Sequence, residues 1–288
     1  MPTLHFGGCG LLSLYHIGVA KALVEIHVDI SKLKENYDIV SGTSGGVLIS
    51  SGLMFNIHPD DMLKIYISMV LNKPSNPFKI CSTAQEVSEK FKLENSVEFF
   101  KESSNKCQVY LSKYKFPLSL KGVTVDCDDL DSDEELLDLW RASYHVPLLG
   151  GGISRKWRDG HYLDGISYSN QLNKEDLLIS PFWYTKYIRK GQCITPSIDF
   201  PALWGFFPPQ DKIAMLLIHK LGYYDCLNHF DKCGNYEDYY EVQYRLQEYA
   251  GYQNQRLYFK LMLAVSIYYY LKNRRNPREL IQNCLRVL

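Results

Sequence analysis

Short apolar runs alternate with longer segments of helical periodicity in the first part of the chain. The run Leu4–Phe6 precedes a segment from Leu11 to Ile26, in which apolar residues recur every three or four positions. A second short run, Tyr37–Val40, precedes the apolar segment Val47–Met54. Glycines separate each run from the segment after it, so the pattern predicts two strand–turn–helix units.

The same alternation continues further along the chain. Residues 59–71 have the pattern of a helix that ends at a turn over residues 74–77, and residues 84–104 have that of a polar surface helix. Gln108–Leu111 and Ser119–Val125 are typical of adjacent strands. Strands that alternate with helices predict an α/β fold, a three-layer structure whose mostly parallel sheet is flanked by helices.

The last part of the chain changes character. Tyr236–Tyr249 is acidic and rich in tyrosine, and Leu257–Leu271 is almost wholly apolar with basic residues after it. The apolar segment is too short to span a bilayer. It fits either a helix packed on the core or an interfacial anchor with a basic flank. We therefore expect a main α/β domain over residues 1–232 and a helical C-terminal extension over residues 233–288.

Composition narrows the functional classes. The 288 residues carry 32 basic and 32 acidic side chains, a balance that argues against nucleic acid as a partner. The eight cysteines show no Cys-x-x-Cys spacing, so we expect free thiols and neither a metal nor a cofactor. The first glycine turn begins at Gly7, which leaves no room for a signal peptide. We expect an intracellular, cytoplasmic protein.

The turn at Gly42-Thr43-Ser44-Gly45-Gly46 has the G-x-S-x-G pattern. A strand that turns sharply into a helix through such glycines exposes the serine hydroxyl, as in a nucleophile elbow. The alternative is a glycine-rich turn whose serine caps the helix. Ser44 is therefore the candidate nucleophile, with Gly42 and Gly46 as the glycines of the elbow.

The first glycine turn, Gly7-Gly8-Cys9-Gly10, lies between a predicted strand and a predicted helix. Successive backbone N–H groups at a helix start form an anion site, suited to phosphate or to the oxyanion of acyl transfer. A G-x-x-x-x-G-K-[ST] loop is absent, and Ser13 stands where G-x-G-x-x-G would need glycine. An oxyanion loop paired with a nucleophile elbow explains both turns.

A nucleophilic serine needs a base, and none of the eight histidines falls in a convincing pattern. His161 is kept as a candidate because Asp164-Gly165 follows it. Asp159-Gly160 fits a hairpin turn, whose outgoing strand would deliver Asp164 to the cleft beside Ser44. The base is thus either a histidine or Asp164.

Taken together, these motifs resemble those of the patatin-like phospholipases, in particular the animal members of the adipose-triglyceride-lipase type. The resemblance covers roughly residues 3–230. It rests on Phe6–Leu12 with Tyr15–Ala20, Gly42–Gly46, Ala142–Pro147, Tyr162–Gly165, Phe206–Pro209 and Gly222–Asp225. Two positions depart from the family pattern, since Cys9 replaces a basic residue common in the oxyanion loop and Ile166 follows the Asp-Gly pair. Neither departure removes a reacting group.

The resemblance implies a Ser–Asp dyad in which Asp164 is the base for Ser44, without a histidine between them. It also implies that Gly7, Gly8, Cys9 and Gly10 form the oxyanion hole and that Gly165 completes the acid motif. An aspartate is a weak base in water, so the dyad needs a partly desolvated site.

The function expected on these grounds is a lipid acyl hydrolase for carboxylic esters of phospholipids or neutral glycerolipids. Its partner would be the lipid substrate at a membrane or lipid-droplet surface. Two alternatives stay open. One is a Ser–His–Asp esterase of another α/β type, and the other is a catalytically silent lipid-binding scaffold.

Overall fold

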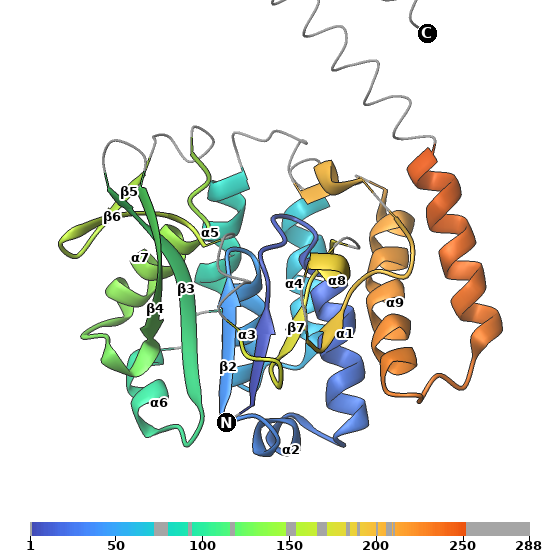
Figure 1. The fold of residues 1–288 in the computed structure, drawn as a ribbon, viewed down its shortest axis with the longest axis horizontal. Helices are drawn as coiled ribbons and strands as arrows, with labels where there is room; N and C mark the ends of the chain where they lie inside the picture. The colour runs from blue at the N-terminus through green and yellow to red at the C-terminus, as the bar shows by residue number, and fades with distance from the viewer. Residues whose placement is uncertain are drawn as a thin grey trace, which may run out of the picture.

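An eight-stranded sheet lies at the centre of the computed structural model (Figure 1). The structure describes residues 2–71, 80–91, 94–115, 119–147, 154–165, 172–182, 185–188, 191–199, 201–205, 209 and 211–251. The strands are β1 (Thr3–Phe6), β2 (Ile39–Thr43), β3 (Lys106–Lys115), β4 (Ser119–Asp126), β5 (Arg155–Trp157), β6 (Gly160–Asp164), β7 (Leu177–Ile179) and β8 (Cys193–Ile194). Their order is β5-β6-β3-β2-β1-β7-β8, with β4 paired to β3.

Parallel pairing joins β8, β7, β1, β2 and β3, whereas β4, β5 and β6 are attached by antiparallel pairing. The helices that flank the sheet are α1 (Ser13–Ile26), α2 (Ile30–Glu35), α3 (Gly46–Met54), α4 (Pro59–Leu71), α5 (Ile80–Phe91), α6 (Ser96–Glu102), α7 (Asp133–Ser143), α8 (Thr185–Ile188) and α9 (Lys212–His229). Short 3-10 turns cover Cys127–Asp129 and Ala202–Gly205. The expected fold class, a mostly parallel sheet flanked by helices, is confirmed.

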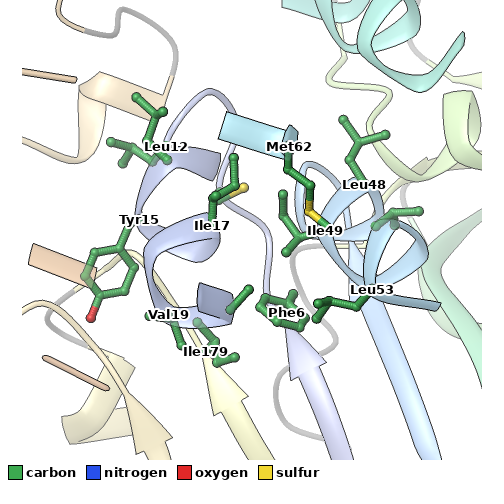
Figure 2. Packing of buried hydrophobic residues seen from close by; sticks show 14 of the residues in the cluster. Phe6, Leu12, Tyr15, Ile17, Val19, Leu48, Ile49, Leu53, Met62 and Ile179 are labelled. Atoms are coloured by element: carbon green, nitrogen blue, oxygen red, sulfur yellow. The ribbon is translucent and has the colours of Figure 1, made fainter. Parts of the chain in front are cut away.

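The core lies where α1 and α3 cover the sheet. Figure 2 shows Phe6 of β1 and Ile179 of β7 beneath side chains of both helices. Both strands are buried along their whole length, as expected for central strands of a parallel sheet. The two predicted strand–turn–helix units are thus present, and their turns lie at the carboxyl ends of β1 and β2.

Two strands meet end to end along one edge of β3. Residues 108–115 of β3 pair with β4 on one edge, so β2 and β6 share the other. On that edge β2 reaches Tyr110 of β3, and β6 arrives from the opposite direction at Leu111. This register brings the end of β2 to the end of β6.

The prediction of one helix over residues 84–104 is wrong in one respect. The structure has two helices there, α5 and α6, and α6 begins after Asn95. Asn95 has φ +59°, a left-handed conformation that asparagine tolerates better than most residues and that does not continue a helix. By contrast, α4 has the predicted bounds, and β3 and β4 are the predicted adjacent strands.

Helix α9 packs closely against α1, and the chain then turns back so that residues 236–251 form a helix beside α9 (Figure 1). Asp225 of α9 joins these helices because it accepts hydrogen bonds from Tyr15 of α1 at 3.0 Å and from Tyr239 at 2.6 Å. Burial raises the pKa of Asp225 to about 6.

The apolar segment 257–271 lies outside the described residues. Among the helices that are described, none combines the length and the apolar character needed to cross a bilayer.

Candidate active site

Ser44 occupies the sharp turn between β2 and α3. Its φ is +54°, a strained conformation for a residue with a side chain, and it is buried. The glycines around it are required by close contacts. A Cβ at Gly42 would lie 2.6 Å from the backbone nitrogen of Val47, and one at Gly46 would lie 2.1 Å from the carbonyl oxygen of Phe6. The chain therefore has the strand–turn–helix geometry of a nucleophile elbow at Ser44.

Asp164 is the last residue of β6, which leaves the hairpin predicted at Asp159-Gly160. Its backbone N–H donates to the carbonyl of His145 at 3.0 Å, and its Oδ1 is shielded from solvent. The next residue, Gly165, lies against β3, where an added Cβ would be 2.5 Å from the carbonyl oxygen of Tyr110. These contacts fix the direction in which Asp164 leaves the sheet.

Gly8 lies against both candidate residues. A Cβ built at Gly8 would be 3.6 Å from Cβ of Ser44 and 3.9 Å from Oδ1 of Asp164. The first glycine turn, the elbow and the end of β6 therefore converge, although they are far apart in sequence. Acyl transfer would need such a convergence of a candidate nucleophile, a candidate base and backbone donors around one point.

The residues of the first glycine turn differ in the contacts that their backbones make. The N–H of Gly7 donates to the carbonyl of Ile179 at 2.8 Å and so continues the pairing of β1 with β7. Gly10 has φ +54°, and a Cβ there would lie 2.3 Å from the carbonyl oxygen of Gly205. Within the described part of the chain, no acceptor bonds the N–H groups of Gly8, Cys9 or Gly10. Gly7 is therefore the residue of this turn whose N–H is committed to a backbone bond within the described residues.

Cys9 supplies a neutral side chain to this turn. Its thiol lies 3.3 Å from Oγ of Ser13, and burial, with a smaller effect from the charge of Asp164, raises its pKa to about 12. The sulfur also packs against the elbow, since a Cβ at Gly45 would lie 2.7 Å from it. The first glycine turn therefore carries no side-chain charge at Cys9.

Two of the histidines, His161 and His16, are not placed to serve as a base for Ser44. His161 is exposed on β6, and its ring lies 3.1 Å from Oγ of Ser154. Alternate residues of a strand face opposite sides, so His161 lies on the side opposite to Asp164. His16 of α1 is buried in the core, where burial lowers its pKa to about 3.

Sequence reasoning missed two sets of residues at this site. His5 on β1 bridges Ser41 at 2.9 Å and Thr43 at 3.2 Å, beneath the elbow. Ser143 at the end of α7 bonds the backbone of Ser44. A polar residue at alternate positions of a buried strand was the available signal for His5. Ser143 lies in the segment Ala142–Pro147 that carries the family resemblance, but its contact with Ser44 depends on tertiary packing and was not predicted.

Among the described residues, no three His, Cys, Asp or Glu side chains are grouped as metal ligands.

Comparison with known proteins places this arrangement in a family. The family model of patatin-like phospholipase matches residues 4–173, which is more than half of the chain. The human 1-acylglycerol-3-phosphate O-acyltransferase PNPLA3 is 26% identical over 192 residues, covering 63% of this chain and 37% of the human protein. This chain thus matches little more than a third of that relative.

Two solved structures are similar at low identity. VipD from Legionella pneumophila has a TM-score of 0.44 and 11% identity, covering 81% of this chain and 67% of VipD. The ExoU–SpcU complex from Pseudomonas aeruginosa has a TM-score of 0.41 and 12% identity, covering 98% of this chain and 65% of the matched one. The family match and the motifs it spans, from the first glycine turn to Asp164, establish that the chain belongs to the patatin-like phospholipase family.

Proposed function

We propose that this protein is a lipid acyl hydrolase that cleaves carboxylic ester bonds of phospholipids or neutral glycerolipids through Ser44 and Asp164. Membership of the patatin-like phospholipase family supports the lipid substrate. The observation that carries the catalytic assignment is the position of Gly8, which lies against both Ser44 and Asp164.

The reaction would proceed in two halves. Asp164 accepts the proton of the Ser44 hydroxyl while Oγ attacks the ester carbonyl carbon, and the tetrahedral intermediate collapses as the proton passes to the leaving alcohol. Water, deprotonated by Asp164, then attacks the acyl-enzyme and releases the fatty acid, with the proton returned to Ser44. No other reactant is needed.

The amides of Gly8, Cys9 and Gly10 would hold the negative charge that develops on the carbonyl oxygen. Removal of one such donor typically costs about 3 kcal/mol of transition-state stabilisation. The neutral thiol of Cys9 adds no like charge beside the oxyanion. The loop would thus act through its backbone alone.

A lipid surface is the expected place of action, because phospholipids and glycerolipids are aggregated in water. We propose peripheral binding at an intracellular membrane or lipid droplet. Exposed apolar side chains support this proposal. Tyr187, Ile213 and Leu216 are exposed, and α9 begins at the end of the molecule where β1 and β2 terminate (Figure 1).

Acyl transfer is a second candidate activity, favoured by the similarity to the human 1-acylglycerol-3-phosphate O-acyltransferase PNPLA3. The same acyl-enzyme would then react with a lipid alcohol in place of water. An assay with a labelled acyl donor and added 1-acylglycerol-3-phosphate separates the two, because hydrolysis gives free fatty acid and transfer gives a diacyl product.

The deciding experiment is labelling of the purified protein with a fluorophosphonate, followed by hydrolysis of a panel of lipid esters. Wild-type protein should label, whereas Ser44→Ala and Asp164→Ala should label at least about 10²-fold more slowly. Ser88→Ala is the matched control, since Ser88 is a buried serine of α5 whose hydroxyl, within the described residues, donates to the carbonyl of Ala84 in its own helix. Equal labelling of wild type and Ser44→Ala, or full hydrolysis by Asp164→Ala, would reject the dyad.

A further inference from the structure

Ser143, the last residue of α7, joins two parts of the site through one hydroxyl. Its Oγ accepts the backbone N–H of Ser44 at 3.0 Å and donates to the carbonyl oxygen of Tyr110 at 2.8 Å. The side chain is fully buried. Both hydrogen-bonding roles of the hydroxyl are therefore filled by backbone groups of the sheet and the elbow.

The bond to Ser44 meets a specific need of the elbow. Ser44 has left β2 and precedes α3, so neither the sheet nor the helix supplies an acceptor for its N–H. A buried N–H without an acceptor is costly, and the strained φ of +54° persists only where the surroundings hold it. Ser143 provides the acceptor.

The same short segment also holds Asp164. The carbonyl of His145, two residues after Ser143, accepts the backbone N–H of Asp164 at 3.0 Å. On β3, the carbonyl of Tyr110 that accepts from Ser143 also lies against Gly165. The end of α7 thus makes one direct hydrogen bond to the backbone of Ser44 and one to the backbone of Asp164.

We infer that Ser143 is a positioning residue, whose hydroxyl fixes the elbow against β3 and α7 so that Ser44 stays within proton-transfer reach of Asp164. The inference rests on the proposed function. The Ser143 hydroxyl bonds backbone atoms of Ser44 and Tyr110, so it would act through the backbone of Ser44.

Loss of the hydroxyl has a defined consequence. In Ser143→Ala the N–H of Ser44 loses its acceptor. The turn would then shift so that this N–H can bond to water or to another acceptor. A displacement of about 1 Å in a catalytic group can lower a rate about 10²-fold. The labelling rate constant of Ser44 should therefore fall about 10- to 100-fold in Ser143→Ala, and kcat for a lipid ester should fall with it while KM stays near its wild-type value.

The test distinguishes an effect of Ser143 on the position of Ser44 from an effect on folding, because it measures the fraction of protein that labels separately from the labelling rate. Fluorophosphonate labelling of the full chain gives both a final stoichiometry and a rate constant for the sites that label. A purely structural role for Ser143 would lower the stoichiometry and leave the rate constant unchanged. A positioning role lowers the rate constant of the folded sites, whatever their number. Ser88→Ala, the buried control, should match wild type in both quantities.

A second pair of variants keeps the test valid if Ser143→Ala folds poorly. Ser143→Thr and Ser143→Val have nearly the same shape, and only threonine keeps the hydroxyl. Faster labelling per site in Ser143→Thr than in Ser143→Val supports the inference, because the added methyl group is common to both. Equal rates in this pair, or a wild-type rate in Ser143→Ala, would overturn it.

Failure of the proposed function has a different signature. If wild type does not label, or labels as well in Ser44→Ala, the nucleophile is wrong and the role of Ser143 is rejected with it. If wild type labels through Ser44 but Ser143→Ala does so equally fast, only the positioning role is rejected.

Discussion

Thr43 and Asp164 occupy neighbouring positions along one edge of β3. Thr43 pairs with Tyr110, and Asp164 pairs with Leu111 from the opposite direction. The residue after Thr43 is Ser44, so a single strand fixes how far apart the candidate nucleophile and base can lie. Hydrogen bonding along β3, rather than a flexible loop, sets the geometry of the site.

The contact between the two glycine turns gives a prediction on activity. A Cβ at Gly45 would lie 2.6 Å from the carbonyl oxygen of Gly10 and 2.7 Å from the sulfur of Cys9. Gly45→Ala should therefore displace the first turn and lower kcat about 10²-fold, as the loss of an oxyanion donor does. Lipid hydrolysis by the folded variant measures this effect.

The control for Gly45→Ala is Gly234→Ala, because no atom of the described residues lies within 4 Å of the added methyl group at Gly234. Its activity should equal that of wild type. Unchanged kcat in Gly45→Ala would show that the first turn does not contribute to the rate.

The Ser–Asp dyad predicts that His161 is dispensable. Its ring is exposed, contacts Ser154 and lies on the side of β6 opposite to Asp164. His161→Gln should keep kcat/KM at its wild-type level, whereas loss of a general base costs about 10² to 10⁴-fold. A loss of that size in His161→Gln would favour the Ser–His–Asp esterase.

Much of the fold could be predicted from the sequence, because local signals were strong where glycine and proline occur. The two glycine turns marked the ends of β1 and β2, and Pro59 marked the start of α4. Asp159-Gly160 marked the hairpin that leads to Asp164. In each case the residue type restricts the backbone by itself.

The remaining features depend on contacts between distant segments. The shared edge of β3 is set by strand register, which residue types leave open when strands are buried on both faces. The N–H of Gly7 donates to the carbonyl of Ile179, so it is not available to an oxyanion. The sequence Gly7-Gly8-Cys9-Gly10 does not predict this bond. The two bonds of Ser143 likewise exist only because α7 ends against the elbow.

Packing between α1 and α9 predicts a stability effect. The helices are so close that a Cβ at Gly222 would lie 2.2 Å from the carbonyl oxygen of Tyr15. Gly222→Ala should lower the free energy of unfolding by about 1–3 kcal/mol, the usual cost of overpacking. Urea unfolding measures it, with Gly234→Ala as a control that should stay within about 0.5 kcal/mol of wild type. Equal stability of both variants would mean that the helices separate at little cost.

Acid should destabilise the protein through His16. This residue is fully buried, its ring nitrogens have no hydrogen-bond partner in the described part of the chain, and burial lowers its pKa to about 3. In the unfolded chain its pKa is about 6.5, so between these values the unfolded state binds the extra proton. Protonation of His16 therefore leaves the free energy of unfolding unchanged above pH 6.5 and lowers it as the pH falls towards 3. At pH 5 the loss is about 2 kcal/mol. Urea unfolding at pH 7 and pH 5 should show a smaller difference in His16→Leu than in wild type, while other groups, including His219, contribute equally to both. The same difference in the two proteins would show that His16 is protonated without cost in the folded state.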